Sequence, residues 1–518
     1  MAHSHWSIIN SYSSLRLTLL NTLDLVVFLG YMLGITLFGS SFYRNNKSSE
    51  AFTLGNGNFP AWVVGMSIFA TFVSSISFIA LPGNAFQSNW NAFVFSLSLP
   101  IASYIAVKFF VPLYRKVNSP SAYTFLEHRF GPWARIYVSS CYLLTQVMRM
   151  GTILYLLALP VNIMFGWDMI TIIIVTGFAV MVYSLLGGIQ GVIWTDAIQG
   201  IILIFGALIC LGYILFTIPG GPSQVFTIAT QHNKFSLGSF SLSLSESTFW
   251  VVLIYGIFVN LQNYGIDQNY VQRYMASRTE GEAKRSAFWG GLLYIPVSLL
   301  FFMIGTALYS YYTALPDALP AELKNKAMSD RVFPYFIVHK LPPGFTGLLI
   351  ASIFAAGMST ISTSINSSAT VVLTDYYQRY KKSKVTDQQS MRVLYLTSML
   401  VSLLGIGIGI ALINVKSALD AWWKLASVFS GGMLGLFLLA AFVKHISQKG
   451  AIAGVVAGVL AILWLSLSPA LFTDGPLQPF ASPFHGYLTI VIGTLIIFLI
   501  GFMASILAGK DQRKHAEV

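Results

Sequence analysis

The chain contains many separate apolar stretches that are each long enough to cross a lipid bilayer, and this feature constrains its fold more than any other. A helix of about 20 apolar residues spans the hydrocarbon core. Thirteen such stretches lie at residues 23–42, 62–81, 92–113, 136–163, 169–186, 192–216, 248–264, 287–309, 347–373, 393–412, 419–443, 451–467 and 487–506. Backbone groups in lipid must be hydrogen bonded internally, and stretches of this length fit helices rather than barrel strands. The sequence therefore predicts an all-α, polytopic membrane protein.

Composition supports one membrane domain over residues 1–518. Hydrophobic residues make up 55% of the chain and charged residues only 9%, and no loop between the apolar stretches is long enough to hold a soluble domain. The first residues lack a basic segment followed by an apolar core with a small-residue cleavage site, so we expect no cleaved signal peptide.

The excess of basic residues, a formal net charge of +12, follows the predicted topology. Twenty of the 30 Lys and Arg side chains fall in alternate loops, among them Arg135 and Arg273. Cytoplasmic loops carry such an excess in membrane proteins. This pattern predicts a cell-membrane protein with its N-terminus outside and its C-terminus in the cytoplasm. It also gives no reason to expect a nucleic-acid partner.

A run of hydroxyl side chains lies inside the apolar stretch 347–373. Its members are Ser359, Thr360, Ser362, Thr363, Ser364, Ser367 and Ser368. Neutral hydroxyl oxygens are hard ligands that can replace the water shell of a small alkali cation. They can also bond their own i−4 carbonyls or join neighbouring helices. Both interpretations stay open from the run alone.

Two of the charged side chains inside the predicted stretches, Arg149 and Asp196, are candidates for a site, because charges at membrane depth usually face a cavity. Arg149 lies about 13 residues into its stretch, roughly 20 Å along a helix, and its guanidinium fork suits a carboxylate. An internal ion pair would explain it as well. Asp196 lies near one end of its stretch and would stay ionised beside a cation; a polar helix start is the alternative.

Two of the predicted helices are interrupted by polar residues, at 69–83 and at 260–267. Where such a helix unwinds, carbonyls such as those of Ala70 and Val73 are freed to coordinate a cation. The two interruptions are five spans apart, the spacing of a five-helix repeat used twice.

Four segments together resemble the sodium/solute symporter family, and in motif they are most similar to its bacterial sialic acid branch. They are residues 70–78, 187–199, 265–274 and 356–367, and the likeness runs from about 23 to 443. The resemblance implies a LeuT-type fold with five-plus-five inverted repeats. It divides the chain into a leading helix (23–42), a first repeat region (59–247), a second repeat (248–443) and trailing helices (451–508).

The resemblance also implies two sodium sites. The family's principal site would fall on the carbonyls of Ala70, Val73 and Ala356 and the hydroxyls of Ser359 and Thr360. A possible second site, known in some sialic acid transporters of the family, would use Asp196, Ser362 and Thr363 together with Ser359. Asp196 would lower the electrostatic cost of a second cation near the first.

For the solute, the resemblance points to Ser74, Ser77, Ser96, Arg149, Asn260 and Gln262. Arg149 would hold a carboxylate, whereas Ser96 stands in a region where the family supplies an amide. Asn263 replaces a gating aromatic of the galactose branch, and Trp422 or Trp423 would close the site from outside.

The expected function is sodium-coupled uptake of a small anionic solute, such as sialic acid, by alternating access within the bilayer. Alternatives within the same family are a neutral sugar, another organic acid or a vitamin. A proton-coupled carrier that uses Asp196 is a further alternative. A sensor or channel is less consistent with hydroxyls grouped beside a broken helix. An enzyme is not expected, since the sequence has no metal-ligand spacing such as H-E-x-x-H.

Overall fold

The computed structural model describes residues 22–325, 328–381, 383–414, 432–444, 446–473 and 476–507. These residues form helices and no strand beyond one isolated bridge between Phe59 and Ser277. The longer helices are α2 (Thr22–Ser41), α4 (Ala61–Phe72), α5 (Ser75–Gln87), α10 (Pro132–Phe165), α11 (Met169–Thr217), α12 (Gly221–Gln231), α13 (Phe249–Ile266), α15 (Glu280–Leu292), α16 (Tyr294–Ala314), α17 (Ser329–Lys340), α18 (Phe345–Val371), α20 (Asp387–Ala411), α22 (Gln448–Leu471) and α23 (Leu488–Leu507).

Short elements complete these helices. They are η1 (Phe42–Asn45), α3 (Ser49–Leu54), η2 (Gly55–Gly57), η3 (Asn91–Phe93), α6 (Val94–Leu97), α7 (Leu99–Ile105), η4 (Ala106–Phe110), α8 (Val111–Val117), α9 (Thr124–Phe130), α14 (Gln268–Ala276), η5 (Pro316–Ala318), η6 (Ala321–Lys324), η8 (Val372–Tyr377), α19 (Gln378–Tyr380), η9 (Leu412–Asn414) and η10 (Gln478–Phe480).

Ten of the described helices are long and apolar enough to cross a membrane, and the bent pair formed by α4 and α5 makes an eleventh. A shorter apolar helix, Gly432–Phe442, lies in the predicted stretch 419–443. The remainder of that stretch, with Trp422 and Trp423, lies outside the described residues. The all-α prediction is confirmed, and the number thirteen stays a prediction.

One long helix, α11, contains two of the predicted stretches. Its 49 residues would reach about 73 Å if straight, more than twice the hydrocarbon thickness. Instead the backbone breaks at Gly188 (φ 52°, ψ −152°). Beyond the break, a Cβ placed on Gly191 would lie 3.5 Å from the Tyr183 carbonyl, a separation that a straight helix does not allow. The chain therefore turns back at Gly188, and α11 contributes two antiparallel arms.

Two other helices are interrupted by residues that cap the segment that follows. Val73 and Ser74 are extended between α4 and α5, whose axes differ by 54°, and Ser74 forms a capping box with Ser77 at the start of α5. Asp267 is extended between α13 and α14, and its carboxylate accepts from the Asn269 N–H at 2.8 Å. Capping side chains satisfy the first free N–H groups of a helix, which is why a new helix begins after each of these residues. Both predicted interruptions are confirmed.

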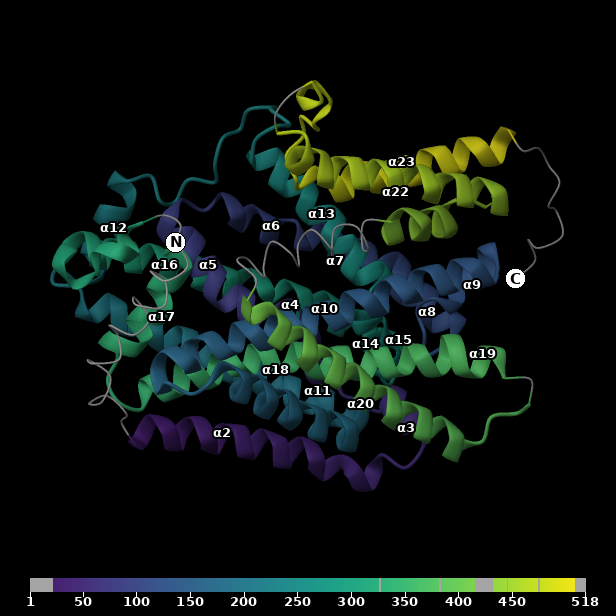
Figure 1. The fold of residues 1–518 in the computed structure, drawn as a ribbon, viewed down its shortest axis with the longest axis horizontal. Helices are drawn as coiled ribbons and strands as arrows, with labels where there is room; N and C mark the ends of the chain where they lie inside the picture. Colours follow the sequence, from purple (N-terminus) through teal and green to yellow (C-terminus); the bar gives the residue numbers. More distant parts are fainter. Residues whose placement is uncertain are drawn as a thin grey trace.

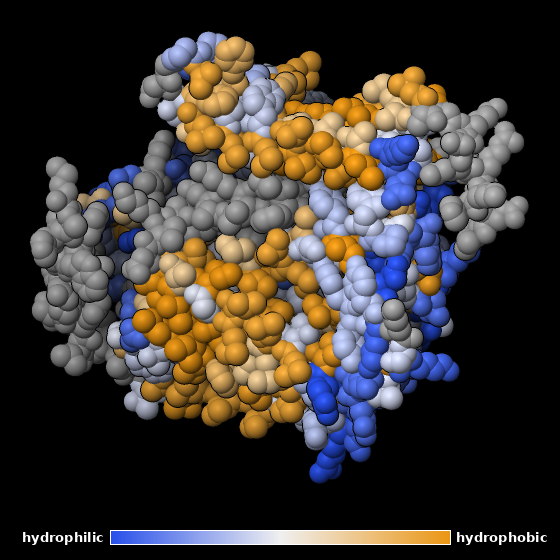
Figure 2. Space-filling model, turned by 45° about the vertical axis from the view of Figure 1, so that its right-hand side comes forward, coloured by the Kyte–Doolittle hydropathy of each residue, from blue (hydrophilic) through white to orange (hydrophobic). Residues whose placement is uncertain are grey.

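Helix α18 is the centre of the molecule. From Leu349 to Val371 every residue is buried, and α2, α4, α5, α10, α11, α14 and α20 all pack against it. In Figure 1 it runs through the middle of the bundle, with α2 along one edge and the α22–α23 pair along the other. The hydroxyl run is thus enclosed by protein, while large apolar side chains such as Leu37, Phe205 and Leu400 are exposed. Figure 2 shows a broad hydrophobic face with hydrophilic residues gathered at one end.

The turn in α11 can be tested with two glycine substitutions on the same element. Gly188→Ala forces a side chain into a backbone region that is essentially restricted to glycine, at a cost of about 1–3 kcal/mol, and its Cβ would lie 2.7 Å from the Asn46 Oδ1 atom. We expect a lower thermal midpoint of the purified protein. Gly212→Ala meets no atom within 4 Å and has ordinary helical geometry, so its midpoint should be unchanged or slightly higher. Equal effects of the two substitutions would contradict the turn at Gly188.

Candidate functional site

Oxygen atoms from two helices meet where α4 ends. The Ser359 hydroxyl of α18 donates to the Ala70 carbonyl at 3.3 Å and to the Ala356 carbonyl at 3.0 Å. The Thr360 hydroxyl donates to the same Ala356 carbonyl at 3.1 Å. All of these residues are buried. The structure thus brings together four of the five residues expected to bind the first sodium ion.

Val73, the fifth, lies in the break itself. In a continuous helix its carbonyl would accept from the Ser77 N–H, but that N–H is bound by the Ser74 hydroxyl at 3.4 Å. The Ala70 carbonyl likewise loses its helical partner, since the Ser74 N–H faces the Ser77 hydroxyl at 3.5 Å. We call Ala70, Val73, Ala356, Ser359 and Thr360 the oxygen cluster. It is neutral and hard, the chemistry that suits an alkali cation. Among the described residues no group of His, Cys, Asp and Glu is suited to a metal of another kind.

Next to the oxygen cluster lies a buried ion pair. Arg273 of α14 donates to the Asp196 Oδ2 atom at 2.6 Å and to the Thr363 hydroxyl at 2.7 Å. Its Nε atom donates to the Ser67 hydroxyl at 2.7 Å, and Ser67 in turn donates to Asp196 at 2.7 Å. The pair joins the two broken helices, through α4 and α14, to α11 and α18.

The interpretation of Arg273 as a loop residue is wrong, because it lies in α14 and its side chain is only 1% exposed. Arg135 was placed in a loop too, and it is buried in an ion pair with Asp375 at 2.6 Å. Both arginines follow polar segments that are typical of loops, but each is buried because it forms an ion pair with a carboxylate of another element. The expected second sodium site therefore already holds a positive charge beside Asp196.

One oxygen of that carboxylate remains without a partner. The Asp196 Oδ1 atom is buried, and no described residue hydrogen bonds to it. The Ser362 hydroxyl, also expected at this site, donates to the Ser359 carbonyl at 3.1 Å. The arrangement leaves one carboxylate oxygen and nearby hydroxyls that a cation can use, next to a guanidinium that has already neutralised part of the charge.

The remaining hydroxyls of the run join α18 to its neighbours. Ser364 donates to Gln146 of α10 at 2.7 Å, and Ser367 donates to Asn269 of α14 at 2.7 Å. The Ser368 hydroxyl has no hydrogen-bond partner among the described residues. Ser364 and Ser367 therefore act as contacts between helices, the alternative use of membrane hydroxyls.

Arg149 is the residue that the sequence predicts to bind the carboxylate of the solute. It lies in α10, half-buried, and no hydrogen bond or ion pair engages its guanidinium within the part of the chain that the structure describes. Its positive charge acts on Asp267, at the break between α13 and α14. A guanidinium with unused donors near a helix break suits a carboxylate ligand.

The expected solute residues divide into two groups. Ser74 and Ser77 lie at the start of α5, in the same break as the oxygen cluster, with their hydroxyls 3.5 Å apart. Ser96 instead donates to Ser298 of α16 at 2.8 Å and is 2% exposed. Its hydroxyl is occupied by a contact between helices, which gives no support to a role in solute binding.

Asn260 of α13 is fully buried and is held by a residue that the sequence did not single out. Its amide nitrogen donates to the Ser98 hydroxyl at 2.9 Å, while its Oδ1 atom has no partner among the described residues. Gln262, two residues further on, is half-buried, and its side chain has no hydrogen bond there. An orphaned amide oxygen is costly in a protein interior, so Asn260 offers an acceptor to a polar ligand. Only the facing helix, not sequence spacing, identifies Ser98.

Comparison with known proteins identifies the relatives of the chain. The model of the sodium:solute symporter family matches residues 52–458. The sodium/sialic acid symporter NanT of Aliivibrio fischeri is 34% identical over 491 residues, with 93% of each chain covered. The sodium/sialic acid symporter SiaT of Proteus mirabilis is 34% identical over 445 residues, covering 85% of this chain and 89% of SiaT. The human sodium/iodide cotransporter is 29% identical over 85% of this chain and 68% of its own length.

Solved structures give the same picture. A Na⁺-coupled sialic acid symporter, in a substrate-bound outward-open state with a novel Na⁺ site, superposes with a TM-score of 0.86 at 31% identity, covering 94% of this chain and 98% of that chain. The transporters Mhp1 and MhsT, each 14% identical, superpose with TM-scores of 0.54 and 0.51 and cover 93% and 98% of their own chains, and 88% and 86% of this one. These last two show a shared fold. The predicted LeuT-type fold is thereby confirmed.

The buried ion pair leads to a test by double substitution. Arg273→Met removes one partner and leaves Asp196 charged and uncompensated, so we expect a loss of about 3–5 kcal/mol, seen as a much lower thermal midpoint. Adding Asp196→Asn should recover a large part of the loss, because the orphaned charge disappears. Arg278→Met, at an exposed arginine that donates to the Asn58 carbonyl at 3.2 Å, is the matched control and should have little effect. A double variant no more stable than Arg273→Met would contradict the pairing.

Proposed function

The chain belongs to the sodium:solute symporter family, and we propose that it takes up a carboxylated sugar such as sialic acid together with Na⁺. It is a transporter rather than an enzyme, and Na⁺ is the coupling ion. The observation that carries the proposal for this chain is the oxygen cluster beside a break that also holds Ser74 and Ser77. Ion and solute would bind on either side of the same two extended residues.

For the first sodium ion we propose the oxygen cluster. Support comes from its two freed carbonyls and two hydroxyls on a buried helix. Binding of Na⁺ would hold α4 and α5 in a fixed position against α18 and so order Ser74 and Ser77. Because linkage is reciprocal, a solute that needs this order would raise the affinity for Na⁺ in return.

For a second sodium ion we propose the Oδ1 atom of Asp196 with the hydroxyls of Ser359, Ser362 and Thr363. Support comes from the orphaned carboxylate oxygen. Arg273 would share Asp196 with this ion, which implies that the second site binds more weakly than the first.

For the solute carboxylate we propose Arg149, with the Asn260 Oδ1 atom, Gln262, Ser74 and Ser77 around the polar groups of the sugar. The guanidinium of Arg149, to which no described residue hydrogen bonds, supports an anionic solute over a neutral one. The names of the two bacterial relatives, which are sialic acid symporters, support the same choice.

The proposed topology places the N-terminus outside and the C-terminus in the cytoplasm, with five-plus-five repeats over residues 59–247 and 248–443. In this orientation α5 and α13 form the outer halves of the broken helices and α4 and α14 the inner halves. The packing of Phe72 against Tyr264, Tyr270 and Tyr294 would then close the inner side, with ring centroids 4.8–5.8 Å apart.

The sodium sites can be tested with hydroxyl removals that keep side-chain shape. Thr360→Val should abolish most Na⁺-dependent uptake of labelled sialic acid into proteoliposomes, and Thr360→Ser should retain it.

The second sodium site can be tested in the same assay, where Thr363→Val should lower the Hill coefficient for Na⁺ towards one. Thr370→Val is the control on the same helix: its hydroxyl donates to the Asn366 carbonyl at 2.9 Å, accepts from Gln272 at 3.0 Å and lies in neither site, so uptake should keep its dependence on Na⁺. Uptake that persists when choline replaces Na⁺ at constant pH would overturn sodium coupling.

The anion site can be tested without a change of charge. Arg149→Lys keeps the positive charge but loses the planar fork, so we expect KM for sialic acid to rise about tenfold, the loss of about 1.4 kcal/mol of binding. A neutral sugar, if carried at all, should be unaffected by the same change. An unchanged KM for the acid would show that Arg149 does not hold the carboxylate.

A further inference from the structure

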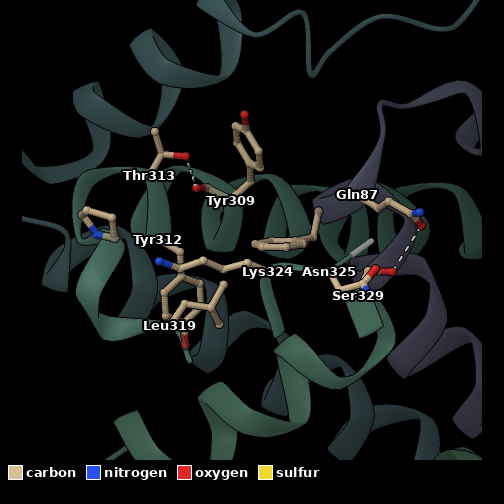
Figure 3. A pocket seen from close by; sticks show the side chains of 10 residues that line it. Gln87, Tyr309, Tyr312, Thr313, Leu319, Lys324, Asn325 and Ser329 are labelled. Carbon is tan, nitrogen blue, oxygen red and sulfur yellow. Dashed lines mark hydrogen bonds between the residues drawn. The ribbon is translucent and has the colours of Figure 1, made fainter. Parts of the chain in front are cut away.

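A cavity of 330 Å³ lies away from the proposed sites, at the C-terminal end of α5. Its walls come from α5, from the end of α16 and from the segment that carries η5, η6 and α17, as Figure 3 shows. Small-molecule sites occupy roughly 300–1,000 Å³, so its size suits a solute as small as a monosaccharide.

Three aromatic rings form one side of the cavity. Phe86 makes edge contacts with Tyr309 and Tyr312, at centroid distances of 5.9 and 6.4 Å. The arrangement is fixed by Lys234, whose ammonium lies 3.8 Å from the Tyr309 ring and donates to the Phe86 carbonyl at 2.7 Å. Rings held in this way offer rigid apolar faces on which a sugar ring can stack.

Polar groups complete the walls. The Ser329 hydroxyl donates to the Gln87 Oε1 atom at 3.2 Å and so orients that amide, whose nitrogen no described residue engages. Lys324 extends across the cavity in Figure 3, and no described carboxylate pairs with its ammonium. The site therefore combines aromatic faces, an oriented amide and one cation that no described carboxylate pairs with.

We propose that this cavity is a second, weaker binding site for the same carboxylated sugar. The carboxylate would lie at Lys324, the sugar ring on Phe86 and Tyr309, and hydroxyls at Gln87. A purely apolar ligand would leave the cation unused, and a neutral sugar would lack a partner for it. The inference rests on the proposed function, because it assigns the class of solute from Arg149.

The cavity and the proposed sodium and solute sites lie at opposite ends of α5. Ser77 and Phe86 are nine residues apart on α5, about 14 Å along the axis. The cavity lacks the oxygen cluster, so solute binding in the cavity should not depend on Na⁺.

The test measures equilibrium binding of radiolabelled sialic acid to the purified full chain. In Arg149→Ala, which removes the central carboxylate partner, we expect a weak phase that is the same with and without Na⁺. Adding Lys324→Gln should weaken this phase about threefold to fivefold, as expected for one exposed charge contact. Adding Arg331→Gln, the matched change at an exposed arginine of α17 outside the cavity, should leave it unchanged.

A missing weak phase, or equal effects of Lys324→Gln and Arg331→Gln, would overturn the second site. If Arg149→Ala does not fold, the same two substitutions in the otherwise unaltered chain, read from the weaker phase, give the same comparison. Absence of Na⁺-dependent sialic acid uptake by the unaltered chain would instead overturn the proposed function. The two failures are thus distinguishable.

Discussion

The hydrogen bond from the Ser359 hydroxyl to the Ala70 carbonyl expresses the constraint on which the centre of this molecule depends. A helix that breaks inside a membrane protein frees carbonyls that no water can satisfy, and each unsatisfied group is costly. Here the cost is offset by hydroxyls on a helix that is buried from Leu349 to Val371. The break is therefore stabilised by the hydroxyl run that packs against it. A cation bound to these oxygens would satisfy the same carbonyls, so ion binding would replace the hydrogen bond between Ser359 and Ala70.

The second broken helix is tied to the same centre by a polar face. In α14, Asn269 contacts Ser367, Gln272 donates to Asn366 at 2.8 Å, and Arg273 reaches Thr363. These partners recur along α18 at positions 363, 366 and 367, one face of a helix. Both broken helices thus hold α18 through hydrogen bonds in addition to apolar packing. Such bonds can be exchanged for bonds to water when the contacts open.

Part of this arrangement could be predicted from the sequence because it depends on local chemistry. Interrupted apolar stretches mark the breaks at Ser74 and Asp267, and hydroxyls in an apolar run mark α18. The partner of a buried charge could not be predicted from the sequence, because it depends on which helices pack together. Arg273 follows a polar segment and reads as a loop residue, yet Asp196, 77 positions earlier, draws it inside. The burial of Ser96 against Ser298 has the same origin. The two apolar stretches on either side of Gly188 indicate a turn between them, but the left-handed backbone conformation of Gly188 could not be predicted from the sequence.

Helix α5 links these observations into one mechanical unit. Its first turn is held by the capping pair Ser74 and Ser77 beside the oxygen cluster, and its last carbonyls, at Ala85 and Phe86, accept from Lys234. Along its length Phe78 stacks on Phe333 of α17, at a centroid distance of 5.8 Å and an interplanar angle of 14°. Lys234 therefore holds the end of α5 that lines the cavity, whereas the capping pair holds its start beside the oxygen cluster. Because the contacts at the two ends are separate, the aromatic walls beside Phe86 keep their arrangement whether or not an ion occupies the oxygen cluster.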